Sequence, residues 1–67
     1  MFYVYDKKLV DIWQSKAMDL GMFVGEFEVD GIKFESIEDQ ETVGDVVWET
    51  HTVWADGVKI YYKEETA

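Results

Sequence analysis

The spacing of apolar side chains changes along the chain, and each spacing predicts a different element. Residues 2–5 are aromatic or β-branched, which favours a short strand. From Leu9 to Leu20 the apolar residues recur at helical intervals, and four of them define one face: Val10, Trp13, Ala17 and Leu20. Gly21 follows at the position where a left-handed glycine commonly ends a helix. One alternative stays open, a hairpin through Asp6–Lys8.

A β-hairpin is predicted next, because the period becomes two. Met22–Val29 and Ile32–Ile37 both alternate, and Asp30-Gly31 between them suits a two-residue type I′ turn. The apolar face of this hairpin then comprises Phe23, Phe27, Val29, Ile32 and Phe34. Its polar face opposes Glu28 to Lys33 and Glu26 to Glu35. The last of these pairs brings two like charges together, which costs stability.

A second hairpin is predicted from Val46–Trp54 and Val58–Lys63. Gly57 suits the left-handed position of a three-residue loop, Ala55–Gly57, that contains a G1 bulge. This loop places Glu49 opposite Lys63, and it gives one face that comprises Trp48, Thr50, Thr52, Trp54, Val58, Ile60 and Tyr62. A two-residue loop is the open alternative, and it would turn Val47 and Val53 inward instead.

Together these elements predict an α+β fold with one short helix and a small antiparallel sheet of four to five strands, in the order β-α-β-β-β-β. We expect the 67 residues to form a single domain, 1–67. A chain of this size buries about 60% of the surface that its unfolded form exposes, so its stability margin is thin. The four Phe, four Tyr and three Trp residues can fill a core, and we expect Trp13 and Trp48 inside it.

The composition removes several kinds of site. Cysteine is absent and His51 is the single histidine, which excludes disulfides and disfavours a structural zinc site. We therefore expect no cofactor. The first residues, MFYVYDKK, show no signal-peptide pattern, and no apolar run approaches the roughly 18–20 residues of a membrane span. The expected location is the cytoplasm of a bacterium or of an infected host cell.

The negative charge is concentrated in one third of the chain. The net charge is −9, and residues 26–49 contain nine acids and one base, a net charge of −8. The remaining residues contain six acids and five lysines, a net charge of −1. This distribution disfavours direct binding to nucleic acid or to an anionic membrane, because their phosphates would be repelled.

Three groups of residues could carry chemistry, and each signal is weak. Ser36 and His51 could join an acid in a hydrolytic triad, but no nucleophile-elbow motif accompanies them. The opposed acids Glu26 and Glu35 could share a proton, but a chain this short rarely encloses a substrate. A further acidic cluster could hold calcium, although it lacks the EF-hand spacing: Glu38, Asp39, Glu41 and Asp45. We predict that the protein is not an enzyme and has no metal site.

The acidic third has two interpretations. It could be a solvated face that keeps a small domain soluble and protects sheet edges. It could instead imitate the spaced charges of a nucleic-acid backbone, and so bind a protein that has a basic nucleic-acid-binding groove. The opposed acids Glu26 and Glu35 favour the second interpretation, because a sequence optimised only for stability would alternate the signs.

The segment Phe34–Ile37 contains the tripeptide Glu-Ser-Ile, which resembles the contact edge of the phage uracil-DNA glycosylase inhibitor family. The small size, the acidity and the lack of Arg and Cys also resemble the DNA-mimic inhibitors of phages and mobile elements. The resemblance implies that Glu35, Ser36 and Ile37 contact the DNA-binding loops of an enzyme. The predicted partner-binding residues are Glu26, Glu28, Glu35, Ser36, Ile37, Glu38, Asp39, Glu41 and Asp45.

The sequence therefore predicts a non-enzymatic inhibitor or interaction protein that acts by DNA mimicry, as a monomer or homodimer. An alternative is a small phage structural or assembly protein that self-associates through sheet edges and exposed aromatic residues. A third possibility is a small enzyme built around His51.

Overall fold

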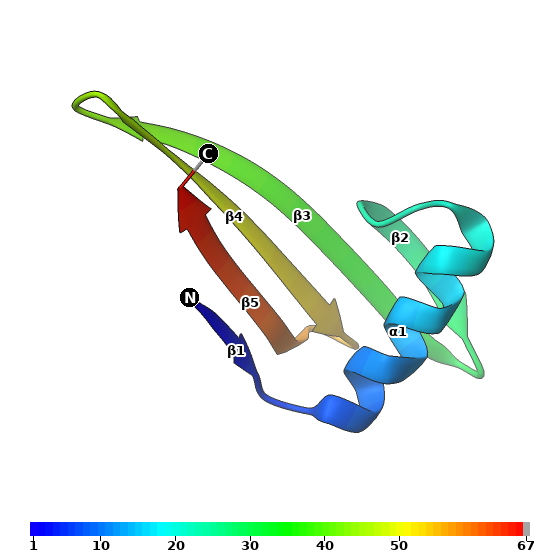
Figure 1. Cartoon of the computed structure of the whole chain (residues 1–67). Helices are drawn as coiled ribbons and strands as arrows, with labels where there is room; N and C mark the ends of the chain where they lie inside the picture. The colour runs from blue at the N-terminus through cyan, green and yellow to red at the C-terminus, as the bar shows by residue number, and fades with distance from the viewer. Residues whose placement is uncertain (67) are drawn as a thin grey trace.

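Five antiparallel strands form one twisted sheet, and a single helix packs across one of its faces (Figure 1). The computed structural model describes residues 1–66. Its elements are β1 (Phe2–Val4), α1 (Lys7–Leu20), β2 (Gly25–Val29), β3 (Ile32–Val43), β4 (Val46–Ala55) and β5 (Val58–Thr66). The strands lie in the order β1-β5-β4-β3-β2 across the sheet. The predicted α+β class and the order β-α-β-β-β-β are confirmed.

Helix α1 begins and ends at residues that satisfy its terminal main-chain groups. The Asp6 carboxylate accepts a hydrogen bond from the Leu9 N–H at 3.1 Å, as an N-cap does. At the other end Gly21 adopts a left-handed conformation (φ 66°), as predicted, and its N–H donates to the carbonyl oxygens of Ala17 and Met18 in the last turn. Residues 6–8 therefore start a helix, and the hairpin alternative through them is wrong.

The hairpin of β2 and β3 has the predicted register. Val29 pairs with Ile32, Phe27 with Phe34, Glu28 with Lys33 and Glu26 with Glu35. Asp30 and Gly31 both have positive φ, as a type I′ turn requires. Strand β2 begins only at Gly25, so the predicted start at Met22 is wrong. The residues before Gly25 cross toward α1, and Phe23 lies against Trp13 with 6.0 Å between ring centroids.

Strand β3 is longer than the alternation predicted. The predicted strand ends at Ile37, whereas β3 continues to Val43 and pairs with β4 over ten residues. The connection to β4 is only Gly44-Asp45, with Gly44 at φ 63°, as a type II′ turn requires at its first position. Residues 38–43 are therefore strand rather than loop, because β-branched pairs on both sides of Gly-Asp favour a hairpin.

The hairpin of β4 and β5 follows the two-residue alternative. Ala55 pairs directly with Val58 across Asp56-Gly57, and both turn residues have positive φ. The three-residue loop is therefore wrong, since Asp-Gly adopts the same type I′ turn here as in the first hairpin. A bulge lies further along, where the register shifts between Val53 and Trp54. Lys63 consequently faces His51, and Glu49 faces Glu65, which corrects the predicted pair of Glu49 with Lys63.

The core lies between α1 and the sheet face that the helix covers. It comprises Val10, Trp13 and Ala17 of the helix, with Phe34, Val53, Ala55 and Ile60 of the sheet. Trp13 is buried as predicted. The predicted face of the second hairpin is wrong, because Val53 is the inward residue and Trp48 is only half-buried on the opposite face. No helix within residues 1–66 is long and apolar enough to cross a membrane.

Phe34 and Ile37 provide a matched test of which face holds the core, because they lie three residues apart on β3. Phe34 is fully buried, whereas 53% of Ile37 is exposed. We expect Phe34→Ala to lower the free energy of unfolding by about 3–5 kcal/mol, a large part of the stability of a small domain. Ile37→Ala should change it by less than about 0.5 kcal/mol. Urea denaturation followed by tryptophan fluorescence measures both, and equal losses would contradict the assigned faces.

Candidate functional site: the open face of the sheet

One face of the sheet has no helix from residues 1–66 over it, and we call this face the open face. Successive side chains of a strand point to opposite faces, so the register assigns each residue to a face. Phe34 and Val53 lie under α1, and their immediate neighbours in each strand therefore point the other way. The open face comprises Tyr3 of β1, Glu26 and Glu28 of β2, Lys33, Glu35, Ile37, Asp39, Glu41 and Val43 of β3, Val46, Trp48, Thr50, Thr52 and Trp54 of β4, and Lys59, Tyr62, Glu64 and Thr66 of β5.

Five of the predicted acids form a strip along the β2 and β3 side of this face: Glu26, Glu28, Glu35, Asp39 and Glu41. Lys33 lies among them, with its Nζ 3.6 Å from Glu26 and 3.7 Å from Glu35. The ammonium thus bridges the two opposed carboxylates and offsets their repulsion, although exposed ion pairs contribute little individually. The opposition of Glu26 and Glu35 is therefore compatible with stability alone and does not by itself favour a binding function.

Three apolar residues lie among and beside these acids, and we call them the apolar strip: Ile37 of β3, and Trp48 and Trp54 of β4. Trp54 pairs with Glu35, and Trp48 pairs with Glu41. Both tryptophans are half-buried, and Ile37 between them is 53% exposed. The two tryptophans thus lie beside two of the acids, with Thr50 and Thr52 between them on β4. Tryptophan at such positions is typical of binding hot spots, because it offers a large rigid contact area.

The β5 side of the open face carries Tyr62. Its hydroxyl donates a hydrogen bond to Glu64 at 2.7 Å, which raises the pKa of the phenol above its ordinary value. The Nζ of Lys59 lies 5.3 Å from the centre of the Tyr62 ring, within the range of a cation–π contact. This side of the face is therefore polar and aromatic, and less acidic than the β3 side.

Three predicted site residues lie off the open face. Ser36 and Glu38 point to the same side as α1, and Ser36 is only 4% exposed. Asp45 is in the β3–β4 turn, at the tip of the hairpin that extends away from the helix (Figure 1). Within the Glu-Ser-Ile tripeptide, Glu35 and Ile37 thus share the open face, whereas Ser36 belongs to the interior.

Ser36 and His51 are neighbours in space, which the sequence could only suggest. The Ser36 Oγ is 2.5 Å from the His51 Nε2 and 2.6 Å from the Phe23 carbonyl oxygen. The His51 Nε2 and the Phe23 carbonyl oxygen are themselves 3.1 Å apart. The geometry fits a Ser36 hydroxyl that donates to the carbonyl while Nε2–H donates to Ser36. A serine whose proton is held by a main-chain carbonyl lacks the general base that activates a nucleophile. The cluster anchors residue 23 to the sheet.

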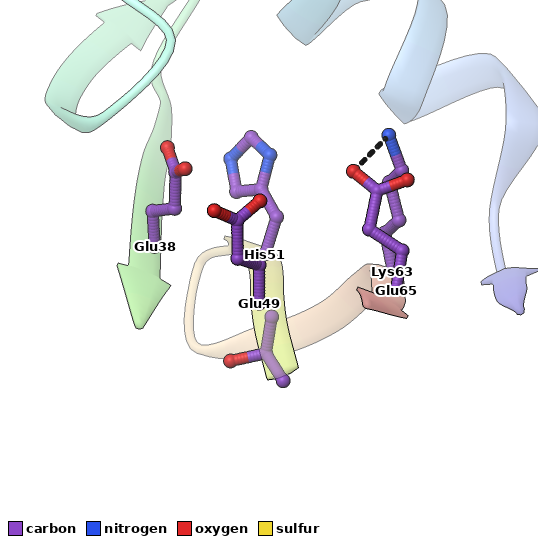
Figure 2. A pocket seen from close by; sticks show the side chains of 6 residues that line it. Glu38, Glu49, His51, Lys63 and Glu65 are labelled. Atoms are coloured by element: carbon purple, nitrogen blue, oxygen red, sulfur yellow. Dashed lines mark ion pairs between the residues drawn. The ribbon is translucent and has the colours of Figure 1, made fainter. Parts of the chain in front are cut away.

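A shallow hollow lies on the α1 side of the sheet, over β3, β4 and β5. Glu38, His51 and Lys63 from three neighbouring strands point into it, and Glu49 and Glu65 flank them (Figure 2). Lys63 pairs with Glu65 at 3.1 Å, and this hydrogen bond raises the pKa of the ammonium. The hollow holds about 90 Å³, room for a few water molecules. Across residues 1–66 no three His, Asp or Glu side chains converge as metal ligands.

The acids considered as calcium ligands do not converge, because alternation separates them. Glu38 points to the α1 side, whereas Asp39 and Glu41 point to the open face. Asp45 is in the turn.

Comparison of the chain with family models, with curated proteins and with solved structures gave no match. The resemblance to glycosylase inhibitors therefore stays a prediction, and the geometry above carries the functional argument.

Trp48, Trp54 and Tyr62 complete the candidate surface, and none of them was among the predicted partner-binding residues. The favoured three-residue loop put them on one face with Ile60, and the two-residue loop was left open as the alternative. The signal that could have found them was the second Asp-Gly dipeptide, which favours a two-residue turn as the first one does. With that turn, alternation puts these residues on the face opposite Val53.

The hydrogen position on His51 tests whether the Ser36 cluster is structural. We expect the neutral imidazole to carry its hydrogen on Nε2, since Nε2 lies close to both the Ser36 Oγ and the Phe23 carbonyl. Long-range proton–nitrogen NMR at alkaline pH measures this directly. The control is Ser36→Ala, in which the Phe23 carbonyl should keep Nε2 protonated. A hydrogen on Nδ1 would instead make Nε2 the acceptor from Ser36, as in a catalytic pair, and would favour the enzyme hypothesis.

Proposed function

We propose that this protein is a non-enzymatic interaction protein whose open face binds a cationic protein partner, at the groove that the partner uses for nucleic acid. The observation that carries the proposal is the placement of the acidic strip and the apolar strip side by side on the one face that no helix covers. Binding there would exclude nucleic acid from the partner, so the biological effect would be inhibition.

The spacing of two acids within the acidic strip supports mimicry. Alternate residues on a strand are about 7 Å apart, so Asp39 and Glu41 present separated charges along a line, as successive phosphates do. Rigid strands hold this line in place, so little order is lost when it binds. A strongly negative surface also attracts a basic partner over distance and makes association depend on salt.

The apolar strip supplies what a polyanion alone does not. Trp48, Trp54 and Ile37 can be desolvated by a partner, and such burial contributes affinity that salt does not screen. This combination distinguishes a specific inhibitor from an acidic surface that only improves solubility. The shape agrees, because the protein measures 43 × 23 × 17 Å and presents a narrow ribbon at its β3–β4 end. We keep the cytoplasm of a bacterium or an infected cell as the proposed place of action.

A second candidate function is self-assembly, as in a phage structural protein. Exposed apolar side chains at the chain start favour it: Met1, Phe2, Val4 and Tyr5. A concentration series in sedimentation velocity separates the two functions, because self-assembly predicts growth of the particle and partner binding predicts a monomer or a stable homodimer throughout.

The open face is tested by two variants that change net charge equally. Glu35→Lys/Glu41→Lys alters the open face, and Asp11→Lys/Asp19→Lys alters exposed positions of α1. Each raises the net charge from −9 by four units, since each replaces two acids by two bases. We expect the open-face variant to lose at least tenfold in affinity for a protein partner that the unmodified protein captures from host lysate. The α1 variant should lose less than threefold.

The measurement is capture from host lysate at low and high salt, followed by competition with duplex DNA. Support requires three results together: the captured protein binds nucleic acid, duplex DNA displaces it, and the open-face variant fails to capture it. Capture that resists duplex DNA, or that both variants retain equally, would overturn the proposed function.

A further inference from the structure

The outer edge of β3 is vacant over more than half of its length. Strand β2 pairs only with residues 32–36 of β3, and no strand within residues 1–66 lies outside residues 37–43. Gly25 marks the boundary, because its positive φ of 124° turns the chain out of the sheet. A hollow beside this vacant edge is lined by Val24, Glu38, Asp39, Gln40 and Glu49. The position that an extended β2 would fill is therefore open.

The main-chain groups that point to this edge follow from the turns. Residues next to a two-residue turn exchange both hydrogen bonds, and bonded pairs then alternate along the ladder. Val43 and Val46 flank Gly44-Asp45, so the odd-numbered residues of β3 bond to β4. Val29 and Ile32 flank the first turn, so the even-numbered residues of β3 bond to the β2 side. Beyond Ser36 the even residues that turn to the vacant side are Glu38, Gln40 and Thr42.

One of these outward N–H groups already has a substitute partner. The Asp39 carboxylate accepts a hydrogen bond from the Gln40 N–H at 2.8 Å. The other outward groups of the segment have solvent beside them, as on any unpaired edge. Seven residues of strand span roughly 24 Å, which is long enough to pair with a strand of ordinary length.

A second copy of the chain fits this edge poorly. An antiparallel pair of two β3 edges centred on Gln40 would set Ile37 against Val43, which is favourable. It would also set Asp39 against Glu41, twice over because of the two-fold symmetry, and like charges directly opposed are destabilising. Each copy further brings a net charge of −3 over residues 37–43, with no base in that segment.

We infer that the vacant edge of β3 binds an extended cationic segment of a protein partner, which adds to the sheet as a sixth strand. Its basic residues would lie opposite Asp39 and Glu41, two positions apart, and apolar residues would lie opposite Ile37 and Val43. Main-chain hydrogen bonds to residues 38, 40 and 42 supply affinity, and the side-chain pattern supplies specificity. The inference goes beyond the proposed function, because a strand recognised through its main chain need not belong to a nucleic-acid groove.

The probe is a capped seven-residue peptide with valine at both ends, lysine at its third and fifth positions and threonine elsewhere. Its second, fourth and sixth amides would face β3. We therefore compare one version N-methylated at those three amides with a control methylated at the third and fifth, which face away. NMR of nitrogen-15-labelled protein follows the amides of Glu38, Gln40 and Thr42, with Glu28 as an internal reference at the other end of the sheet.

We expect the unmodified peptide to slow hydrogen exchange at the three β3 amides, and methylation of the facing amides to weaken binding at least tenfold more than methylation of the others. Gln40→Pro removes the central outward donor at a position where an edge strand tolerates proline, and it should abolish binding. Gln40→Thr keeps the donor and should bind normally. Circular dichroism checks that both variants fold.

The inference is overturned if the two methylated peptides bind equally, or if a folded Gln40→Pro variant binds as well as Gln40→Thr. It is also overturned if the same amides are protected without peptide in a protein that sediments as a dimer, because the occupant is then a second copy. The two proposals fail independently, because the peptide contains no nucleic-acid groove. A peptide that does not bind the β3 edge leaves the lysate capture by the open face unaffected. A failed lysate capture likewise leaves the peptide result unaffected.

Discussion

Within residues 1–66 a single short helix is the only cover for a five-stranded sheet, and the rest of the structure depends on that limit. Helix α1 lies across the strands rather than along them (Figure 1), so its width of roughly 10 Å covers only part of β3, whose 12 residues span roughly 40 Å. The helix therefore covers one end of one face. The core is confined to that end, where Trp13 and Ala17 meet Phe34 and Val53. The far end of the β3–β4 hairpin and the whole open face have to be compatible with water.

The distribution of charge follows from this limit. An uncovered face and an unpaired strand edge both invite other chains to associate, and acids along β3 oppose association with copies of the same protein. Near the core the repulsion between acids is reduced, because the Lys33 ammonium bridges Glu26 and Glu35. Beyond Ile37 no base is interspersed along β3, and the charge there is unmoderated. The end of the sheet that is farthest from the core is thus the end that most strongly selects a cationic neighbour.

Local signals in the sequence predicted the fold well where one signal decided the outcome. Asp30-Gly31 fixed the register of the first hairpin, and Gly21 fixed the end of the helix. The prediction failed where two signals competed. At Asp56-Gly57 the glycine fitted both a three-residue and a two-residue loop, and the wrong choice reversed the faces of Trp48 and Val53. Alternation also could not reveal that β3 continues to Val43, since both faces are polar there and the period of two disappears.

The candidate surface was only half predictable for the same reason. The acids of β3 could be predicted because charge is read directly from the sequence. Assigning them to a face requires only the alternation of side chains along that one strand. The faces of the neighbouring residues Trp48 and Trp54 depend on the β4–β5 hairpin, where a loop that is one residue longer reverses them. Ser36 shows the converse, because three adjacent residues of a sequence motif lie on alternate faces once they form a strand. A contact motif read from sequence therefore has to be tested against strand parity before its residues are assigned together.

The open face bears on the choice between a solvated surface and a binding surface. A face that serves solubility alone is favoured when charges are dispersed and large apolar side chains are few. Here Trp54 lies directly beside Glu35, Trp48 lies beside Glu41, and Ile37 is half exposed between them. Retaining two tryptophans there leaves apolar area in contact with water, and a small domain gains nothing in stability from that part of their surface. Partner binding explains both strips with one function, whereas solubility explains only the acids.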